Sequence, residues 1–314
     1  MGLFSNNKKL CPICGSPTPR LLATKVEDMP ICKDCAAKVE LPGGALAQMS
    51  LEQFRQYLAY YDENQALRDV FEATHRMGFG FLESDLLVDT SHRLLRLAGH
   101  DSALAFPASA LKSFRFTEDG RTLFESGNGC LLCHRSDVPE RAMDLQPHID
   151  RFYFQRDEFR RMERMEEMHQ RRDRRPGEPE DRPYRPEPTF DMPAPVRRFG
   201  VELTLDDPYW KSFSKEIKAP GLSSMNPDLN EYLRDYDSKV GEMHDMALAL
   251  ARVMDPAARE VWDDEAAATQ AAAPQAAAPA ADAVTELQRY KMLLDTGVIT
   301  EEEFSAKKKQ LLGI

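Results

Sequence analysis

The chain of 314 residues lacks long apolar runs, and no stretch approaches the roughly 20 residues that a membrane-spanning helix needs. Residues 1–10 contain no apolar core of signal-peptide length, so we expect a cytoplasmic protein. Basic residues are also the minority, with 41 Lys and Arg against 52 Asp and Glu. The net charge of -11 argues against a protein built mainly to bind nucleic-acid phosphates.

Recognisable catalytic motifs are missing as well. The sequence has no phosphate-binding glycine loop, no HExxH and no GxSxG, and no nucleophile stands in a known pattern with a base. Its seven histidines are scattered, and His75, His92, His100 and His244 are interpreted as ordinary surface or cap residues. We therefore expect a protein that is not an enzyme, and the sequence identifies no small-molecule substrate.

Cysteine is scarce, but four of the six cysteines lie close together near the N-terminus. Cys11 and Cys14 form one CxxC pair, and Cys32 and Cys35 form a second pair after 17 intervening residues. This spacing is typical of a zinc ribbon with four thiolate ligands, which leaves no open position on the metal. The sequence therefore predicts a structural Zn²⁺, with two disulfides or four unrelated thiols as the alternatives.

The remaining cysteines belong to the run Cys130-Leu131-Leu132-Cys133-His134. CxxCH is also the attachment motif for c-type haem, but that chemistry needs an export signal, which we do not expect here. Cys130, Cys133 and His148 are candidate ligands of a second metal, with His134 as a competitor. Two partly buried thiols in a loop are the alternative, and the sequence favours it slightly.

Changes in composition divide the chain into six segments. Leu41-Pro42-Gly43-Gly44 ends the cysteine-rich start, seven prolines lie between Arg175 and Val196, and an Ala- and Pro-rich stretch precedes the last 30 or so residues. The expected segments are a zinc ribbon (1–42), a helix and the first part of a β domain (48–130), an insertion that is helical and then a solvated linker (131–195), the second part of the β domain with a long helix (196–256), a linker (257–283) and a helical hairpin (284–314).

Local patterns within these segments predict individual elements. Ser50 and Gln53 form a capping box for a helix, and the turn at Asp89–His92 indicates a β-hairpin. Alternation returns in 199–205, so we expect this strand to pair with strands from before Cys130. A long apolar stripe follows Pro227, with Asn226 as the expected N-cap.

The terminal hairpin carries large apolar side chains on two short helices. Two helices of this size cannot bury much apolar area alone, so they need a partner surface. We expect protein partners or further copies of the chain to bind here, while a hairpin folded back onto its own β domain is the alternative. The expected contact residues are Leu287, Tyr290, Leu294, Phe304, Leu311 and Leu312.

The cysteine pairs, the helix after them, and the segments FPASALKSFRFTEDG and VELTLDD resemble a family of uncharacterised bacterial zinc-ribbon proteins. The resemblance covers about 1–126 and 196–254. It implies an α+β multidomain fold: an N-terminal rubredoxin-like zinc ribbon, a small β-barrel that looks like a pleckstrin-homology (PH) fold closed by a C-terminal helix, and the terminal two-helix hairpin.

Residues 284–314 resemble the short C-terminal domain known as SHOCT. The resemblance implies oligomerisation or attachment to other proteins, so the expected function is that of a zinc-binding adaptor or scaffold. Two alternatives stay open. The ribbon and the basic runs Lys8-Lys9 and Arg171–Arg175 would suit a nucleic-acid or nucleoprotein binder, and the PH-like domain would suit a lipid surface, the latter by fold analogy alone.

Overall fold

The computed structural model describes residues 10–80, 85–173 and 185–263. The chain divides into two compact units, Met1–Asp263 and Asp264–Ile314. Residues 284–314, for which a hairpin is expected, belong to the second unit, which lies outside the described residues.

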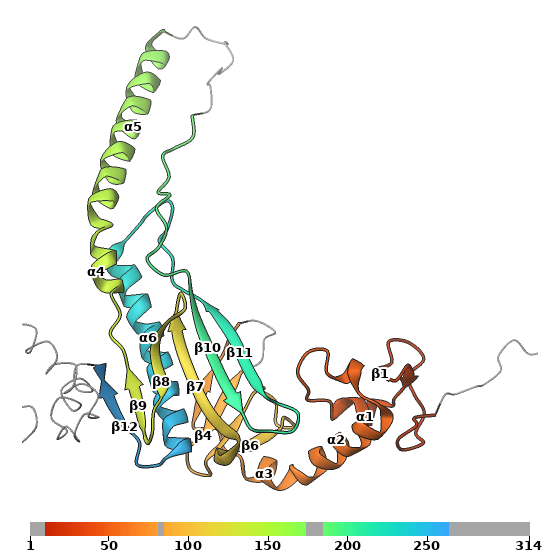
Figure 1. Ribbon diagram of the computed structural model, residues 1–314. Helices are drawn as coiled ribbons and strands as arrows, with labels where there is room; N and C mark the ends of the chain where they lie inside the picture. Colours follow the sequence, from red (N-terminus) through yellow and green to blue (C-terminus); the bar gives the residue numbers. More distant parts are fainter. Residues whose placement is uncertain (1–9, 81–84, 174–184, 264–314) are drawn as a thin grey trace, which may run out of the picture. The chain divides into compact units, whose positions relative to one another are not determined.

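The N-terminal part consists of one small hairpin and a series of short helices (Figure 1). Its elements are β1 (Lys25–Val26), β2 (Met29–Pro30), α1 (Lys33–Ala37), η1 (Leu46–Gln48), α2 (Leu51–Glu63) and α3 (Gln65–Val70). The capping box predicted for α2 is present, with Ser50 and Gln53 each accepting a hydrogen bond from the other's backbone amide. The buried face of α2 consists of Phe54, Tyr57, Leu58 and Tyr61.

Two antiparallel meanders follow. The first sheet has the order β3-β4-β5-β6, formed by β3 (His75–Met77), β4 (Leu86–Asp89), β5 (Leu94–Arg96) and β6 (Ala105–Pro107). After η2 (Ala108–Ala110), the second sheet begins with β7 (Leu111–Glu118), β8 (Arg121–Ser126) and β9 (Cys130–Cys133). The predicted hairpin around Asp89–His92 is the β4–β5 connection.

The second sheet is completed by strands from much later in the chain. Strands β10 (Arg198–Leu205), β11 (Ser212–Lys218) and β12 (Arg259–Trp262) give the order β11-β10-β7-β8-β9-β12. Strand β10 pairs antiparallel with β7, from Phe199 opposite Glu118 to Leu205 opposite Leu111. The pairing predicted from the alternation in 199–205 is therefore present, whereas the parallel pairing of β12 with β9 was not foreseen.

The region between β9 and β10 contains α4 (Val138–Met143) and α5 (Gln146–Asp173). Part of the stretch expected to be a solvated linker is fixed by packing, because Phe190 is buried and its ring lies 5.8 Å from that of Phe152 on α5. The Arg160–Glu187 ion pair also attaches this stretch to α5, and the Phe190 amide donates to the Ser224 carbonyl at 2.8 Å. The expectation of a solvated linker in the later part of 131–195 does not hold at Phe190.

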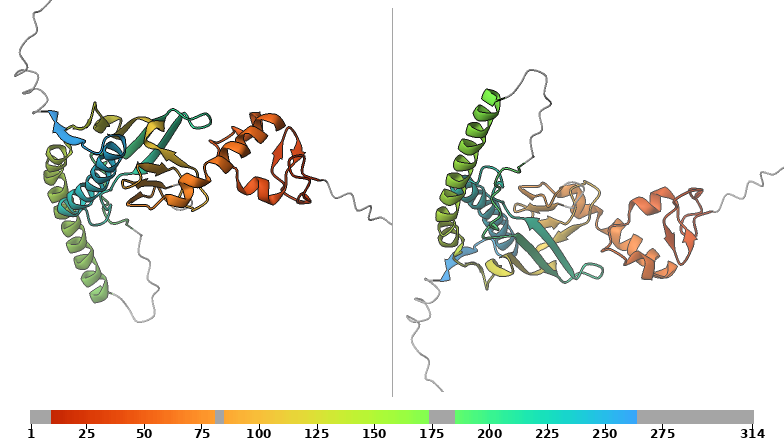
Figure 2. Two further views of the ribbon diagram at one scale, coloured as in Figure 1. Left: turned by 90° about the horizontal axis from the view of Figure 1, so that it is seen from below. Right: turned by 90° about the horizontal axis from the view of Figure 1, so that it is seen from above.

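Helix α6 (Leu229–Met254) contacts strands of both large sheets, including β3, β4, β7, β8 and β9 (Figures 1 and 2). Its buried face follows the predicted stripe through Tyr232, Tyr236, Met243 and Leu250. The N-cap is Asp228 and not the expected Asn226. The Asp228 carboxylate accepts hydrogen bonds from the amides of Asn230 and Glu231. The helix therefore begins two residues later than the Asn-Pro pair indicated.

The mixed α+β class is confirmed, but the PH-like barrel is not. Each large sheet has two edge strands, β3 and β6 in one and β11 and β12 in the other. Within the described ranges the strands thus form separate open sheets with α6 against them, and they do not close into a barrel.

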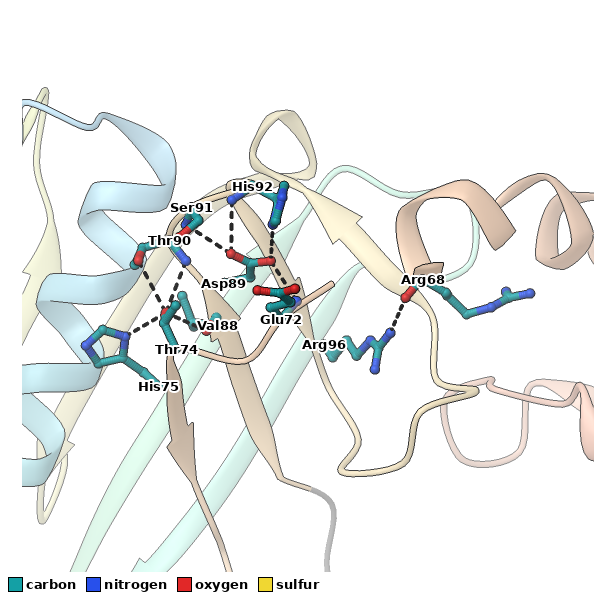
Figure 3. A network of polar contacts seen from close by, with 10 residues as sticks. All are labelled: Arg68, Glu72, Thr74, His75, Val88, Asp89, Thr90, Ser91, His92 and Arg96. Carbon is teal, nitrogen blue, oxygen red and sulfur yellow. Dashed lines mark hydrogen bonds and ion pairs between the residues drawn. The ribbon is translucent and has the colours of Figure 1, made fainter. Parts of the chain in front are cut away.

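A buried carboxylate organises the β4–β5 turn (Figure 3). Asp89 is fully buried and accepts hydrogen bonds from the amides of Glu72, Ser91 and His92 at 2.8–3.0 Å, and from the His92 ring. Burial alone would raise the pKa of Asp89, but the amides of Glu72 and His92 and the His92 ring together lower the pKa below its ordinary value. The turn therefore depends on an ionised carboxylate.

We expect Asp89→Asn to lower the free energy of unfolding by about 1–3 kcal/mol near pH 7, because buried amides lose a charged acceptor. A depressed folded-state pKa stabilises the protein above the unfolded pKa of about 3.9 and ceases to do so as pH falls through the folded pKa. In urea unfolding, the difference in free energy of unfolding between wild type and variant should thus become smaller below about pH 4. The exposed Asp235→Asn serves as control. A gap independent of pH would contradict this account.

The β7–β10 pairing also has a direct test. Leu203 is buried in the shared sheet, whereas its neighbour Glu202 points outward to Arg115. Leu203→Ala should cost about 2–5 kcal/mol of unfolding free energy by leaving a cavity. Glu202→Ala should cost less than about 1 kcal/mol, because it removes only a surface ion pair. Equal losses in urea melts would mean that β10 does not contribute to the core.

Candidate metal centre

The four N-terminal cysteines come together in space. Their sulfur atoms are 3.4 Å apart for Cys14–Cys32, 3.7 Å for Cys14–Cys35 and 4.0 Å for Cys11–Cys35. Four sulfurs at the corners of a tetrahedron, each about 2.3 Å from a central ion, would be about 3.8 Å apart. The side chains thus form a group that could hold a metal ion.

Two backbone turns place these sulfurs. In the first CxxC turn, the Gly15 amide donates to the Cys11 carbonyl at 2.9 Å, and Gly15 has a φ of +73°, which a residue with a side chain rarely adopts. In the second turn, Cys32 is the N-cap of α1, and its sulfur accepts a hydrogen bond from the Cys35 amide at 3.4 Å. Each turn therefore orients two thiols toward the same point.

The electrostatics of the cluster also favour a cation. The hydroxyl and amide of Ser16 lower the pKa of the Cys14 thiol to about 6, whereas burial and the neighbouring thiols raise the pKa of Cys35. Adjacent thiols cannot all ionise without a positive charge between them, because neighbouring thiolates repel one another, and their pKa values therefore differ. A bound divalent cation would remove this conflict.

The cysteine cluster packs into the hydrophobic core, to which Cys11, Cys32 and Cys35 belong. Val26 of β1 and Ile31, which follows β2, are buried in the same core cluster as Phe54 and Tyr57 of α2. The Tyr57 hydroxyl donates to the Lys38 carbonyl at 2.8 Å and accepts from the Glu40 amide at 2.7 Å. Helix α2 therefore holds the chain just after the second cysteine pair.

A further connection comes from the second sheet. The Trp210 indole, in the β10–β11 connection, donates to the carbonyl of Glu40 at 2.9 Å. The C-terminal end of the cysteine-rich segment is thus held by hydrogen bonds to α2 and to Trp210. Sequence reasoning did not foresee either contact, because both join residues that are distant in the chain.

The structure separates the three residues suggested as ligands of a second metal. Cys133 is fully buried in β9, Cys130 is partly buried in the same strand, and His148 is exposed on α5. Cys133 lies instead with His244 of α6 and Glu260 of β12, their ligand atoms all within 4.8 Å of one another. Burial and the carboxylates of Glu260 and Asp263 raise the pKa of Cys133 to about 12.

Sequence reasoning missed His244 and Glu260 as possible ligands, since it interpreted His244 as a surface or cap residue. No local spacing could reveal them, because the three residues come from three separate elements. The six residues of the expected contact surface, Leu287 to Leu312, lie outside the described residues.

Residues 285–312 match the model of the SHOCT family, the short C-terminal domain. Comparison of the chain with curated proteins and with solved structures finds no match. None of the helices in the described ranges is both long and apolar enough to cross a membrane.

We expect Cys32→Ser to reduce the number of metal ions per chain by one, because three sulfurs no longer close the tetrahedron. Elemental analysis of the full chain measures this loss. Amide exchange of residues 10–42 should rise with it, since metal binding and local folding are coupled, while exchange in β7 and β10 stays slow. Unchanged metal content in Cys32→Ser would contradict the assignment of the cluster as a metal centre.

Proposed function

We propose that this chain is a non-enzymatic adaptor whose zinc-stabilised N-terminal segment and sheet domain are connected to other proteins, or to further copies of itself, through residues 284–314. The observation that carries this proposal is the SHOCT match at 285–312, a small C-terminal module that follows a linker rich in Ala and Pro. A short module of this type, on a linker, is suited to attachment.

Zinc is the metal that fits the four-cysteine cluster best. Zinc prefers tetrahedral coordination, and four thiolates are a frequent ligand set of structural zinc sites. Cys11, Cys14, Cys32 and Cys35 supply that set, with sulfur separations close to a tetrahedral edge. With all four positions taken by protein, the ion would hold the two turns together and leave no place for a substrate, which supports a structural zinc ribbon.

The apolar residues of the terminal segment supply the energetic reason for docking. Leu287, Tyr290, Leu294 and Phe304 would each gain roughly 1.5–3 kcal/mol on full burial, and so would Leu311 and Leu312. A segment of about 30 residues cannot bury all of them within itself. A partner surface would supply the missing contacts.

Substitution of Phe304 by Asp should lower the fraction of oligomer, because the added charge would have to be buried in the contact. Deletion of 284–314 should have the same effect, whereas Gln310→Asp adds the same charge at a polar position and should have little effect. Light scattering of the full chain measures the mass, and metal content should stay unchanged throughout.

Equal mass for wild type, Phe304→Asp and the truncated chain would rule out self-association. The heterotypic version then predicts that specific proteins co-purify from the native cells with wild type and Gln310→Asp, but not with Phe304→Asp. Recovery of the same proteins with and without residues 284–314 would overturn the adaptor proposal.

A further inference from the structure

Three possible metal ligands meet at the edge of the six-stranded sheet where β12 joins β9. Strand β12 lies parallel to β9, with Glu260 opposite Leu131 and Trp262 opposite Cys133 (Figure 1). In a parallel ladder, side chains of paired residues project from the same face of the sheet. Glu260 and Cys133 therefore share a face, and helix α6 contacts β9.

Helix α6 supplies the third group to this face. Phe124 of β8 is paired with Cys133, and its ring lies edge-on against the His244 ring with centroids 5.3 Å apart. The imidazole Nε2 is 3.3 Å from a carboxylate oxygen of Glu260. The ligand atoms of Cys133, His244 and Glu260 are thus all within 4.8 Å of one another.

These polar atoms are poorly satisfied by the protein itself. Nε2 of His244 is buried and makes no well-formed hydrogen bond within the described part of the chain. The Cys133 thiol has only a long contact of 3.9 Å to the Leu131 carbonyl, although the residue is fully buried. Buried polar atoms without good partners are costly, and a metal ion is one partner that would satisfy a sulfur, an imidazole nitrogen and a carboxylate oxygen together.

We propose that Cys133, His244 and Glu260 form a second metal site that binds a divalent transition-metal ion of the zinc class. A thiolate and a carboxylate together carry the two negative charges that such an ion neutralises. Tetrahedral zinc would place these atoms about 3.3–3.6 Å apart, and the 3.3 Å between His244 Nε2 and the Glu260 carboxylate already lies in this range. The Cys133 sulfur, which lies within 4.8 Å of both, would have to move closer by no more than about 1.3 Å. The three ligands leave one coordination position for water or an external ligand, unlike the four-cysteine cluster.

The group of three lies near the surface, on the side of Glu260. The Glu260 side chain is 37% exposed and that of His244 is 24% exposed, whereas His244 Nε2 and Cys133 are buried. Among the strands of the described ranges, β12 is an edge strand that pairs with β9 alone, and in the sequence it precedes the segment that leads to the SHOCT region. A metal bound here would connect β12 to α6 as well as to β9.

Cys130 and His134 are a thiol and an imidazole that lie close to the proposed site in the sequence but are not part of it. The Cys130 sulfur lies against Gly127, where an added Cβ would come within 2.5 Å of it. His134 is directed to Asp263, with 2.8 Å between Nδ1 and a carboxylate oxygen. Neither residue belongs to the group of three, so a cysteine-to-serine change at Cys130 should leave the second ion in place.

Co²⁺ is a suitable probe, because its absorption bands distinguish a site of four thiolates from one with mixed ligands. The full chain in excess Co²⁺ should bind two ions, and Cys130→Ser should also bind two. Cys133→Ser and His244→Phe should bind one, the latter with its aromatic packing on Phe124 retained. Glu260→Gln, at a partly exposed position, should weaken the second site at least tenfold.

Tryptophan fluorescence gives an independent measure of the second ion. The chain has two tryptophans, so Trp210→Phe leaves only Trp262, which is paired with Cys133. Co²⁺ should quench Trp262 in this chain, and adding His244→Phe should abolish the quenching. Thermal melts and the four-thiolate absorption verify that each variant is folded.

Binding of a single Co²⁺ by the wild-type chain would overturn the second site. Retention of the second ion in all three ligand variants would do so as well. Loss of that ion in Cys130→Ser would assign it to the two cysteines of β9 instead. Cys32→Ser reports on the four-cysteine cluster separately, so failure of one site is distinguishable from failure of the other.

Discussion

The pairing of β10 with β7 is the constraint on which the rest of the structure depends. It joins residues on either side of a long insertion that contains α4 and α5, and it places both strands in the interior of the six-stranded sheet. Once β10 is fixed there, the chain returns through β11 to α6, whose buried face covers strands of both sheets. After α6 ends at Met254, the chain forms β12, which pairs parallel with β9.

The two candidate metal centres differ in how the chain assembles them. The four N-terminal cysteines are brought together by two local turns, each fixed by hydrogen bonds within a few residues. The group of Cys133, His244 and Glu260 exists only when the sheet and α6 are complete. A metal ion in the first would stabilise the segment around the two turns, whereas an ion in the second would bind only after the six-stranded sheet and α6 have assembled.

Sequence patterns predicted the features that short stretches of chain determine. The CxxC spacing indicated the cysteine cluster, the Ser50–Gln53 pair indicated the start of α2, and alternation in 199–205 indicated β10. The parallel pairing of β12 depends on the position of α6, so no local pattern contains it. The same reason explains why His244 was interpreted as a surface residue, and why Phe190 in a proline-rich stretch was not expected to be buried. The resemblance to SHOCT could be found from the sequence because its motif lies in one continuous stretch of the chain.

Native-state hydrogen exchange of the intact chain tests the central claim most directly, namely that one sheet is formed across the insertion. The interior amides of β7 and β10 are expected to exchange at the same slow rate, because opening of either strand breaks the ladder that both share. Their protection should disappear together at the concentration of denaturant that unfolds α6. If β10 exchanged orders of magnitude faster than β7, the two halves would be independent and the account would be contradicted.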